Sequence, residues 1–187
     1  MAKHELYPDT WIDVYSDQML GYAITRVQDR DLAKDLVQES FFVALRSRQT
    51  YRGELSEKNW LYLILRSRIL DHYKKKKEVT ESQLQNNRND EGEGDNFLEN
   101  GAWKADTAPK EWNADRMVES KEFMVVLNKC RSRLTDMQQS VFTLKFIDGE
   151  TSEDICKELD ITSSNYWVLV HRAKLQLRSC LEKNWMT

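Results

Sequence analysis

Two short helical patterns separated by a tight turn lie near the end of the chain, in TSEDICKELDITSSNYWVLVHRAKLQLRSCLE. The first helix is expected to begin at Ser152, whose hydroxyl can accept from free backbone amides, and two acidic residues follow where the helix dipole favours anions. Ile161 supplies the apolar plug of the turn, and Thr162 or Ser163 offers an oxygen that caps the next helix. The stretch therefore predicts a helix-turn-helix.

The second helix of this pair has two distinct faces. One stripe, spaced by threes and fours, is apolar and must be buried. The other is cationic and aromatic, which suits a phosphate backbone and the major groove, into which a recognition helix inserts its N-terminal residues. An ordinary amphipathic hairpin with a solvated basic face fits the same pattern, so the rest of the chain has to decide. The apolar stripe is Tyr166, Val170, Ala173, Leu177 and Leu181, and the cationic stripe is Trp167, His171, Lys174 and Arg178.

The net charge of −3 is unevenly distributed along the chain. Residues 78–119 contain eleven acidic and four basic residues, so the remainder carries a net +4. The acidic segment is rich in Asn, Glu, Gly and Asp and has no sustained period, which predicts a linker. We expect a helical domain at residues 1–77, an acidic flexible linker at 78–116 and a second helical domain at 117–187.

Glycine and proline are scarce, and helical periods run through nearly the whole chain. No alternating segment is bounded by turn dipeptides, so we predict an all-α fold, for which 40% hydrophobic residues suffice to form compact cores. No apolar run approaches membrane-spanning length, and the N-terminus lacks the apolar core of a secretion signal. We therefore expect a cytoplasmic protein with no membrane insertion.

The residue types that could catalyse a reaction or bind a metal form no recognisable motif in the sequence. Cys130, Cys156 and Cys180 stand far apart without a CxxC pair, and we expect buried thiols rather than a zinc site or a disulfide. The three histidines are scattered, and no glycine-rich phosphate loop follows a strand. The sequence assigns no catalytic residue, no metal and no cofactor, which argues against an enzyme.

The segment DLAKDLVQESFFVALR is expected to carry an aromatic residue on its polar face. A large aromatic beside exposed carboxylates is unusual for a monomer, and aromatics are enriched at protein contacts, which favours a partner surface. A single exposed Phe among solvated charges is the plainer alternative. The inward positions are Leu32, Leu36, Val37, Ser40, Phe41, Ala44 and Leu45, and the outer face is Asp35, Gln38, Glu39, Phe42 and Arg46.

A polar loop, SRQTYRGELS, and a helix, EKNWLYLILRSRILDHYKKKK, combine aromatic with basic residues. Single-stranded DNA is held by stacking of bases on aromatics together with neutralisation of its backbone. The lysine run also fits a solvated helix end that complements the dipole, and Trp60 also fits a core position. The candidate nucleic-acid contacts here are Tyr51, Arg52, Asn59, Trp60, Tyr62, Arg66, Arg68, Lys74 and Lys75.

Five segments occur in a characteristic order: DLAKDLVQESF, ALRSR, WLYLILRSRILDH, LTDMQQSVFTLKF and the terminal helix-turn-helix. In this order they resemble an extracytoplasmic-function sigma factor of the sigma-70 family. The first segment, with its spacing to WLYLI and LDH, is the most specific part, whereas many regulators share a helix-turn-helix. The resemblance covers nearly the whole chain except the linker, and it implies two helical domains, called regions 2 and 4.

The resemblance also implies a division of roles. It assigns Asp35, Gln38, Glu39 and Phe42 to the β′ clamp of core RNA polymerase, and region 4 to the β flap and the minus-35 element. The loop and the helix after it would melt the minus-10 element and trap a flipped base, and the linker would follow the RNA path. The expected DNA contacts in region 4 are Ser163, Ser164, Asn165, Trp167, His171, Arg172, Lys174 and Arg178.

Three residues depart from the family pattern: Ser67 stands where Asn is usual, and Trp167 and Leu169 stand where basic residues are common. The whole chain still predicts a transcription initiation factor that recruits core RNA polymerase to a promoter and promotes strand opening, with an anti-sigma factor as a further partner. A stand-alone helix-turn-helix regulator is the alternative, and a helical adaptor that binds only protein is a third. Polymerase dependence and salt-dependent DNA affinity separate them.

Overall fold

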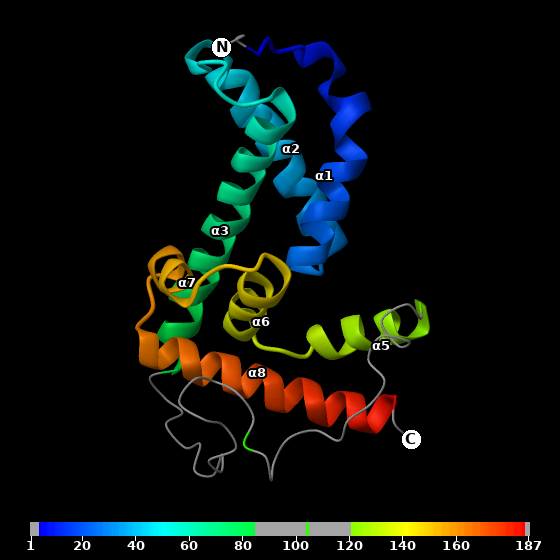
Figure 1. Cartoon of the computed structure of the whole chain (residues 1–187), viewed down its shortest axis with the longest axis vertical. Coiled ribbons are helices and arrows are strands. Elements are labelled where there is room, and N and C mark those ends of the chain that lie inside the picture. The colour runs from blue at the N-terminus through cyan, green and yellow to red at the C-terminus, as the bar shows by residue number, and fades with distance from the viewer. Residues whose placement is uncertain (1–3, 85–103, 105–120, 186–187) are drawn as a thin grey trace. The chain divides into compact units, whose positions relative to one another are not determined.

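A computed structural model describes residues 4–84, 104 and 121–185 (Figure 1). These residues form helices, turns and bends without a strand, which confirms the all-α prediction. Much of the predicted acidic linker lies outside them. None of the helices described is long and apolar enough to cross a membrane. The chain divides into two compact units, residues 1–73 and 74–187, and each is described by itself.

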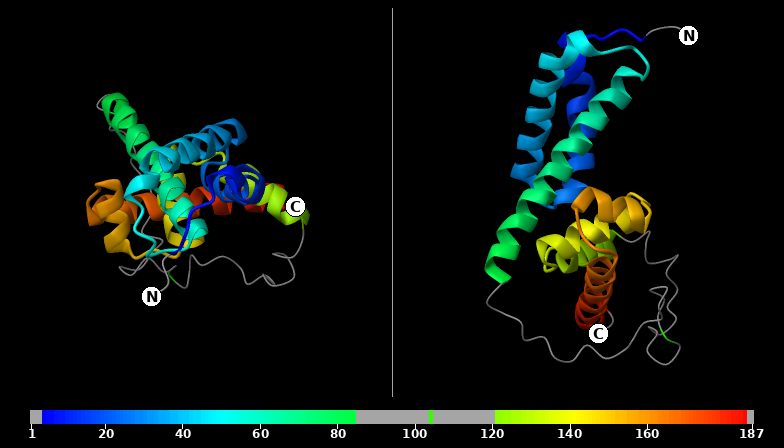
Figure 2. Two further views of the ribbon diagram at one scale, coloured as in Figure 1. Left: turned by 90° about the horizontal axis from the view of Figure 1, so that it is seen from above. Right: turned by 90° about the vertical axis from the view of Figure 1, so that its left-hand side faces the viewer.

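The first unit is built from α1 (Trp11–Val27), α2 (Arg30–Ser47) and residues 57–73 of α3 (Glu57–Leu84). Gln28 adopts a left-handed conformation and ends α1, and the Asp29 side chain then caps α2 by accepting from the amides of Asp31 and Leu32. The short connection makes α1 and α2 antiparallel neighbours (Figures 1 and 2). A 3-10 turn, Arg48–Thr50, and an irregular loop lead from α2 to α3.

The Glu57 carboxylate attaches the start of α3 to α1. Its Oε1 accepts from Trp11 Nε1 at 2.6 Å, and its Oε2 accepts from the Tyr15 hydroxyl at 3.1 Å. Trp11 is fully buried, together with Met19 and Ala23. Burial, followed by the hydrogen bond to Glu57 and its charge, raises the pKa of Tyr15, which therefore remains a donor at neutral pH.

Two expectations for this unit are wrong in detail. Leu45 is 42% exposed rather than inward, because it lies three residues after Phe42 and shares the outer face of α2.

Helix α3 extends to Leu84, seven residues beyond its expected end at Lys77. The added residues contain neither glycine nor proline, so nothing in their backbone chemistry ends the helix earlier.

The second unit contains α5 (Lys121–Arg131), α6 (Asp136–Phe142), a π-helical segment (Thr143–Ile147), α7 (Ser152–Leu159) and α8 (Ser163–Asn184). Helices α7 and α8 form the predicted helix-turn-helix. Thr162 caps α8 by accepting from Asn165 N at 3.2 Å, one of the two caps considered. The cap of α7 is Thr151 rather than Ser152, because its extended backbone places Oγ1 3.1 Å from Asp154 N.

The predicted apolar stripe of α8 forms the core of this unit. Tyr166, Val170, Ala173 and Leu177 are buried, and Leu181 is partly buried. A cluster of Cys130, Leu134, Ala173, Leu177 and Cys180 joins α5 and the turn after it to α8. The capping box at Thr135 then begins α6, with both of its hydrogen bonds formed.

Cys130 and Cys180 form a disulfide, so the expectation of isolated buried thiols is wrong for this pair. Their Cα atoms lie 5.7 Å apart although 50 residues separate them in the sequence. Spacing along the chain cannot reveal this proximity, because the packing of α5 against α8 creates it. Cys156 is the free cysteine of the described residues; it is half-buried, and burial raises the pKa of its thiol.

We predict that Glu57→Ala destabilises the protein by about 1 to 3 kcal/mol, because the indole donor of buried Trp11 loses its acceptor. Denaturant unfolding followed by circular dichroism measures the change. Asp17→Ala removes an exposed acid from α1 and serves as the control, with an expected change within about 0.5 kcal/mol. Equal stability of the two variants would show that Glu57 does not anchor α3.

Candidate nucleic-acid interface

A hollow of about 190 Å³ opens beside the loop that precedes α3. Its volume is below the roughly 300 to 1,000 Å³ of sites for drug-sized ligands, so it suits a single small planar group. The residues that line it are Thr50, Tyr51, Arg52, Glu54, Leu55 and Trp60. Three of these, Tyr51, Arg52 and Trp60, were predicted from the sequence, and the structure brings them together.

Two aromatic side chains form one wall of the hollow. The ring centroids of Tyr51 and Trp60 lie 4.9 Å apart, and Trp60 in turn meets the edge of Trp11 at 6.1 Å. The Tyr51 hydroxyl donates to the carbonyl oxygen of Leu55, which fixes the ring across the loop. Burial, with a smaller contribution from Glu57, raises the pKa of Tyr51, so the phenol keeps its proton. The wall is therefore formed before any ligand arrives.

Gly53 gives the loop its shape. Its φ of 75° is in the left-handed region, where a side chain is disfavoured, and its carbonyl oxygen accepts from His4 N at 3.2 Å. The sequence signal for this turn was the glycine itself, but Glu54 and Leu55, which complete the hollow, carry no signal in the sequence. Their place follows only from the path of the loop.

The other predicted contacts of α3 have different surroundings. Tyr62 meets the edge of the Tyr22 ring at 5.2 Å and so packs against α1. Arg68 forms ion pairs with Glu39 at 3.3 Å and Asp71 at 3.0 Å, which links the predicted DNA face of α3 to the predicted docking face of α2. Exposed positions are Asn59, Lys74 and Lys75, whereas Arg66 is half-buried.

The outer face of α2 is exposed as predicted. Asp35, Gln38 and Glu39 are exposed, and the Phe42 residue is 68% exposed. Leu45 adds a second apolar residue to the same face, which the sequence reasoning missed. Its spacing of three residues from Phe42 was the signal that could have found it. We call Asp35, Gln38, Glu39, Phe42 and Leu45 the α2 docking face.

The N-terminal turn of α8 is open, whereas its predicted cationic stripe is partly covered. Ser163, Ser164 and Asn165 are exposed. Burial lowers the pKa of Lys174, the nearby charge of Lys145 lowers it further, and the ammonium lies 5.7 Å from the centre of the Phe146 ring. The half-buried members of the predicted set are Trp167, His171, Arg172, Lys174 and Arg178.

Some of these half-buried side chains have partners that explain their positions. Trp167 lies between the rings of Tyr166 and His171, with centroid distances of 5.0 and 6.0 Å, and Arg178 pairs with Glu182 at 2.8 Å. Val168 is 41% exposed, and sequence reasoning missed it. It follows Ser164 by one turn, which was the available signal.

The groups in this arrangement suit binding to a nucleic acid. Aromatic faces, amide and hydroxyl groups and guanidinium groups offer stacking, hydrogen bonding and phosphate neutralisation. Within the described ranges, no group of three or more His, Cys, Asp or Glu side chains could hold a metal ion.

Comparisons with known proteins agree with this arrangement. Residues 11–79 match sigma-70 region 2, and residues 126–177 match sigma-70 region 4. A probable RNA polymerase sigma factor of Haemophilus influenzae is 34% identical over 184 residues, 97% of this chain and 93% of that protein. SigX of Bacillus subtilis, an ECF RNA polymerase sigma factor, is 25% identical over 91% of this chain and 81% of its own length.

The solved complex of the sigma factor RpoE with the anti-sigma factor NepR from Bartonella quintana is also similar. Its similar chain is 16% identical, with a TM-score of 0.45 over 94% of this chain and 97% of that one.

A region 2 unit followed by a region 4 unit with a helix-turn-helix defines the class of factors that start transcription with RNA polymerase. The chain belongs to the sigma-70 family, within its ECF branch. It is a transcription initiation factor that directs RNA polymerase to promoters, and the stand-alone regulator is not favoured.

We predict a coupling of about 0.2 to 1 kcal/mol between Glu39 and Arg68 in a double-mutant cycle of unfolding free energies, because the pair is partly exposed. The variants are Glu39→Ala, Arg68→Ala and the double substitution. Asp35→Ala, one turn earlier on the same face of α2, replaces Glu39 in a control cycle and should be additive. A zero coupling for Glu39 would show that solvent separates the pair.

Proposed function

We propose that the hollow walled by Tyr51 and Trp60 captures one unstacked base of the minus-10 element and thereby drives strand opening. The observation that carries this proposal is the pair of aromatic rings 4.9 Å apart beside a small open hollow. Unpairing costs roughly a few kcal/mol per base, and stacking on an aromatic contributes about 1 to 3 kcal/mol per base. One well-held base therefore offsets much of the cost.

The polar groups around the hollow support the same assignment. Arg52 is exposed at its rim, where a guanidinium can meet a phosphate or stack on a base. Asn59 is exposed one residue before Trp60 and offers an amide to a base edge. Arg66, Arg68, Lys74 and Lys75 then supply positive charge along α3 for the phosphate backbone.

We predict that Tyr51→Ala weakens strand opening by about 1 to 3 kcal/mol and leaves binding to the closed duplex unchanged, because duplex docking depends mainly on phosphate neutralisation. Arg68→Ala should weaken both steps. Polymerase-dependent transcription is compared on a linear duplex and on the same promoter pre-melted across the minus-10 region. Pre-melting should partly rescue Tyr51→Ala.

Tyr51→Phe is the matched control, because it keeps the ring and removes only the hydroxyl that donates to Leu55. It should transcribe the intact duplex much better than Tyr51→Ala. If Tyr51→Ala matches wild type on the intact duplex, the loop does not hold the base, and Trp60 and Tyr62 become the candidates.

The α2 docking face is proposed to bind the clamp of the polymerase β′ subunit. Phe42 and Leu45 form an apolar patch, and Asp35, Gln38 and Glu39 place polar groups beside it on the preceding turns of α2. An apolar anchor inside a polar rim is the usual anatomy of a protein interface. The inclusion of Leu45 extends the face that the sequence predicted.

We predict that Phe42→Ala weakens binding to core RNA polymerase by about 30-fold, corresponding to roughly 2 kcal/mol for a buried aromatic anchor. Leu45→Ala should weaken it in the same direction. Ile12→Ala is the control, because Ile12 is an equally exposed apolar residue, at 67%, on α1. Binding is measured by competition with a labelled sigma factor, and unchanged affinity of folded Phe42→Ala would refute this assignment.

Helix α8 is proposed to read the minus-35 element from its N-terminal turns. Ser163, Ser164 and Asn165 are exposed there and can donate to bases or phosphates. Val168 offers methyl groups to a thymine methyl. Arg172, His171 and Lys174 would contact the phosphate backbone of the DNA beside these bases. Trp167 occupies a position where the family commonly has a basic residue. Contacts with bases should therefore contribute more to DNA binding here than attraction between positive side chains and phosphates.

Control by an anti-sigma factor is also proposed. The exposed Phe42 and Leu45 leave an apolar surface that a second protein can cover when polymerase is not bound. Such a partner would work in the cytoplasm, where the polymerase is. Co-purification of the tagged factor from its native host identifies the partner.

A further inference from the structure

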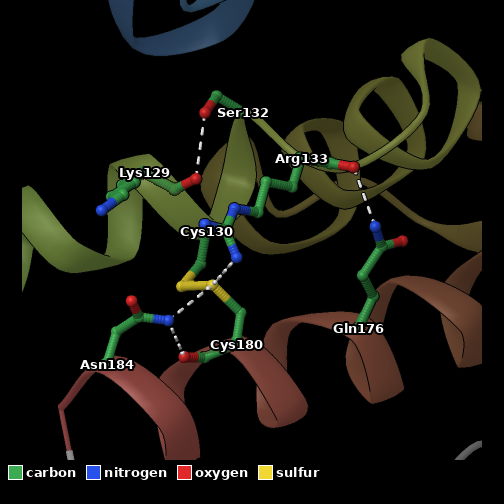
Figure 3. Close-up of a disulfide and its surroundings, with 7 residues drawn as sticks. All are labelled: Lys129, Cys130, Ser132, Arg133, Gln176, Cys180 and Asn184. Atoms are coloured by element: carbon green, nitrogen blue, oxygen red, sulfur yellow. Dashed lines mark hydrogen bonds between the residues drawn. A yellow bond between two sulfur atoms is a disulfide. The ribbon is translucent and has the colours of Figure 1, made fainter.

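The disulfide of the second unit joins α5 to α8, the helix proposed to read DNA (Figure 3). Cys130 lies in the last turn of α5, and Cys180 lies one turn before the end of α8 at Asn184. The bond closes a loop of 50 residues that contains α6, α7 and most of α8. We propose that this pair is a reversible oxidation site for peroxide, with Cys180 as the attacking sulfur and Cys130 as the resolving sulfur.

The surroundings of Cys180 distinguish the two sulfurs. Arg133 Nη1 lies 3.8 Å from Cys180 Sγ, and Asn184 Nδ2 lies 3.6 Å from the same atom (Figure 3). A guanidinium and an amide donor both stabilise negative charge on a sulfur, which is the form that attacks oxidants. Arg133 is held near the pair because its carbonyl oxygen accepts from Gln176 Nε2 at 2.8 Å.

The place of Cys130 suits a resolving role. It is fully buried, whereas Cys180 retains 6% exposure, so a small oxidant meets Cys180 first. Both sulfurs belong to the apolar cluster with Leu134 and Leu177, so the feature that marks Cys180 as the first nucleophile is the pair of polar donors beside its sulfur. Cys130 lies within bonding reach of Cys180, as the disulfide shows.

The reaction balances with hydrogen peroxide as the oxidant. The Cys180 thiolate attacks one peroxide oxygen, the O–O bond breaks, and a sulfenic acid and one water form after protonation of the released hydroxide. The Cys130 sulfur then attacks the sulfenic sulfur, and a second water leaves as the S–S bond forms. Two electrons pass from the two sulfurs to the peroxide. A dithiol reductant of the thioredoxin class reverses the step by thiol–disulfide exchange.

The redox state should change the stability of the second unit. A bond that closes a 50-residue loop restricts the unfolded chain, whereas the reduced unit keeps the apolar cluster around Ala173 and Leu177. Reduction should therefore lower the Tm of this unit by about 10 to 30 °C, while the apolar cluster keeps it folded at moderate temperature. In a compartment that keeps thiols reduced, formation of the bond would report oxidative conditions.

The test uses the reduced full-length protein, hydrogen peroxide and a sulfenic-acid probe, with mass spectrometry as the readout. Wild type should form the Cys130–Cys180 bond, and dithiothreitol should reverse it under native conditions. Cys130→Ser should trap the probe at Cys180, whereas Cys180→Ser should leave Cys130 unlabelled. Cys156→Ser is the matched control and should behave as wild type. Labelling at Cys130 instead of Cys180, or a bond that only denaturation allows to be reduced, would overturn the proposal.

Arg133 is proposed as a positioning residue, so its test needs a readout that folding alone does not change. Arg133→Ala should shift the pH profile of Cys180 alkylation to higher pH and slow peroxide oxidation about tenfold at pH 7, and Arg133→Lys should partly restore both. An unchanged profile in Arg133→Ala overturns this role.

The effect of oxidation on promoter-directed transcription rests on the proposed function of α8, and it is measured in a separate experiment. Holoenzyme assembled with oxidised factor should retain promoter-directed transcription at a temperature at which the reduced factor has lost it. The thiol chemistry is measured without DNA or polymerase, so its failure would leave the assignment of α8 intact. Conversely, normal thiol chemistry without promoter binding would count only against α8.

Discussion

The start of α3 depends on the carboxylate of Glu57. Its two oxygens accept from the indole of Trp11 and the hydroxyl of Tyr15, both on α1. Trp60 follows one turn later and forms the wall of the hollow with Tyr51, which lies in the loop just before this anchor. The geometry that would hold a base is therefore a consequence of how an acidic side chain satisfies buried donors on another helix.

In the second unit, α8 has different tasks at its two ends. Its C-terminal half packs on α5 through an apolar cluster and a disulfide, whereas its first turn is capped by Thr162 and open to solvent. Packing and the disulfide fix the direction of α8 within its unit, which would orient the exposed N-terminal residues for the proposed entry into the major groove. Stability and the proposed DNA recognition thus occupy separate turns of one helix.

Several basic side chains form ion pairs with carboxylates of the same chain, and a DNA phosphate would have to replace these carboxylates. Arg68 pairs with Glu39 and Asp71, and Arg178 pairs with Glu182. Partly exposed ion pairs are worth roughly 1 kcal/mol or less, so a phosphate can exchange for a carboxylate at little cost. These pairs hold the basic side chains in place and would not prevent their proposed contacts with phosphates.

The sequence by itself determined the helical class, the approximate helix boundaries, the helix-turn-helix, the buried stripe of α8, the exposed Phe42 and the family, because helical period, capping residues and motif order are local properties. Tertiary structure decided the partial cover on Lys174, the shape of the hollow and the pairing of Cys130 with Cys180. The helical periodicity of apolar residues shows which residues share a face of one helix, but it does not show which other helix covers that face. Likewise, two cysteines 50 residues apart become partners only when α5 packs against α8.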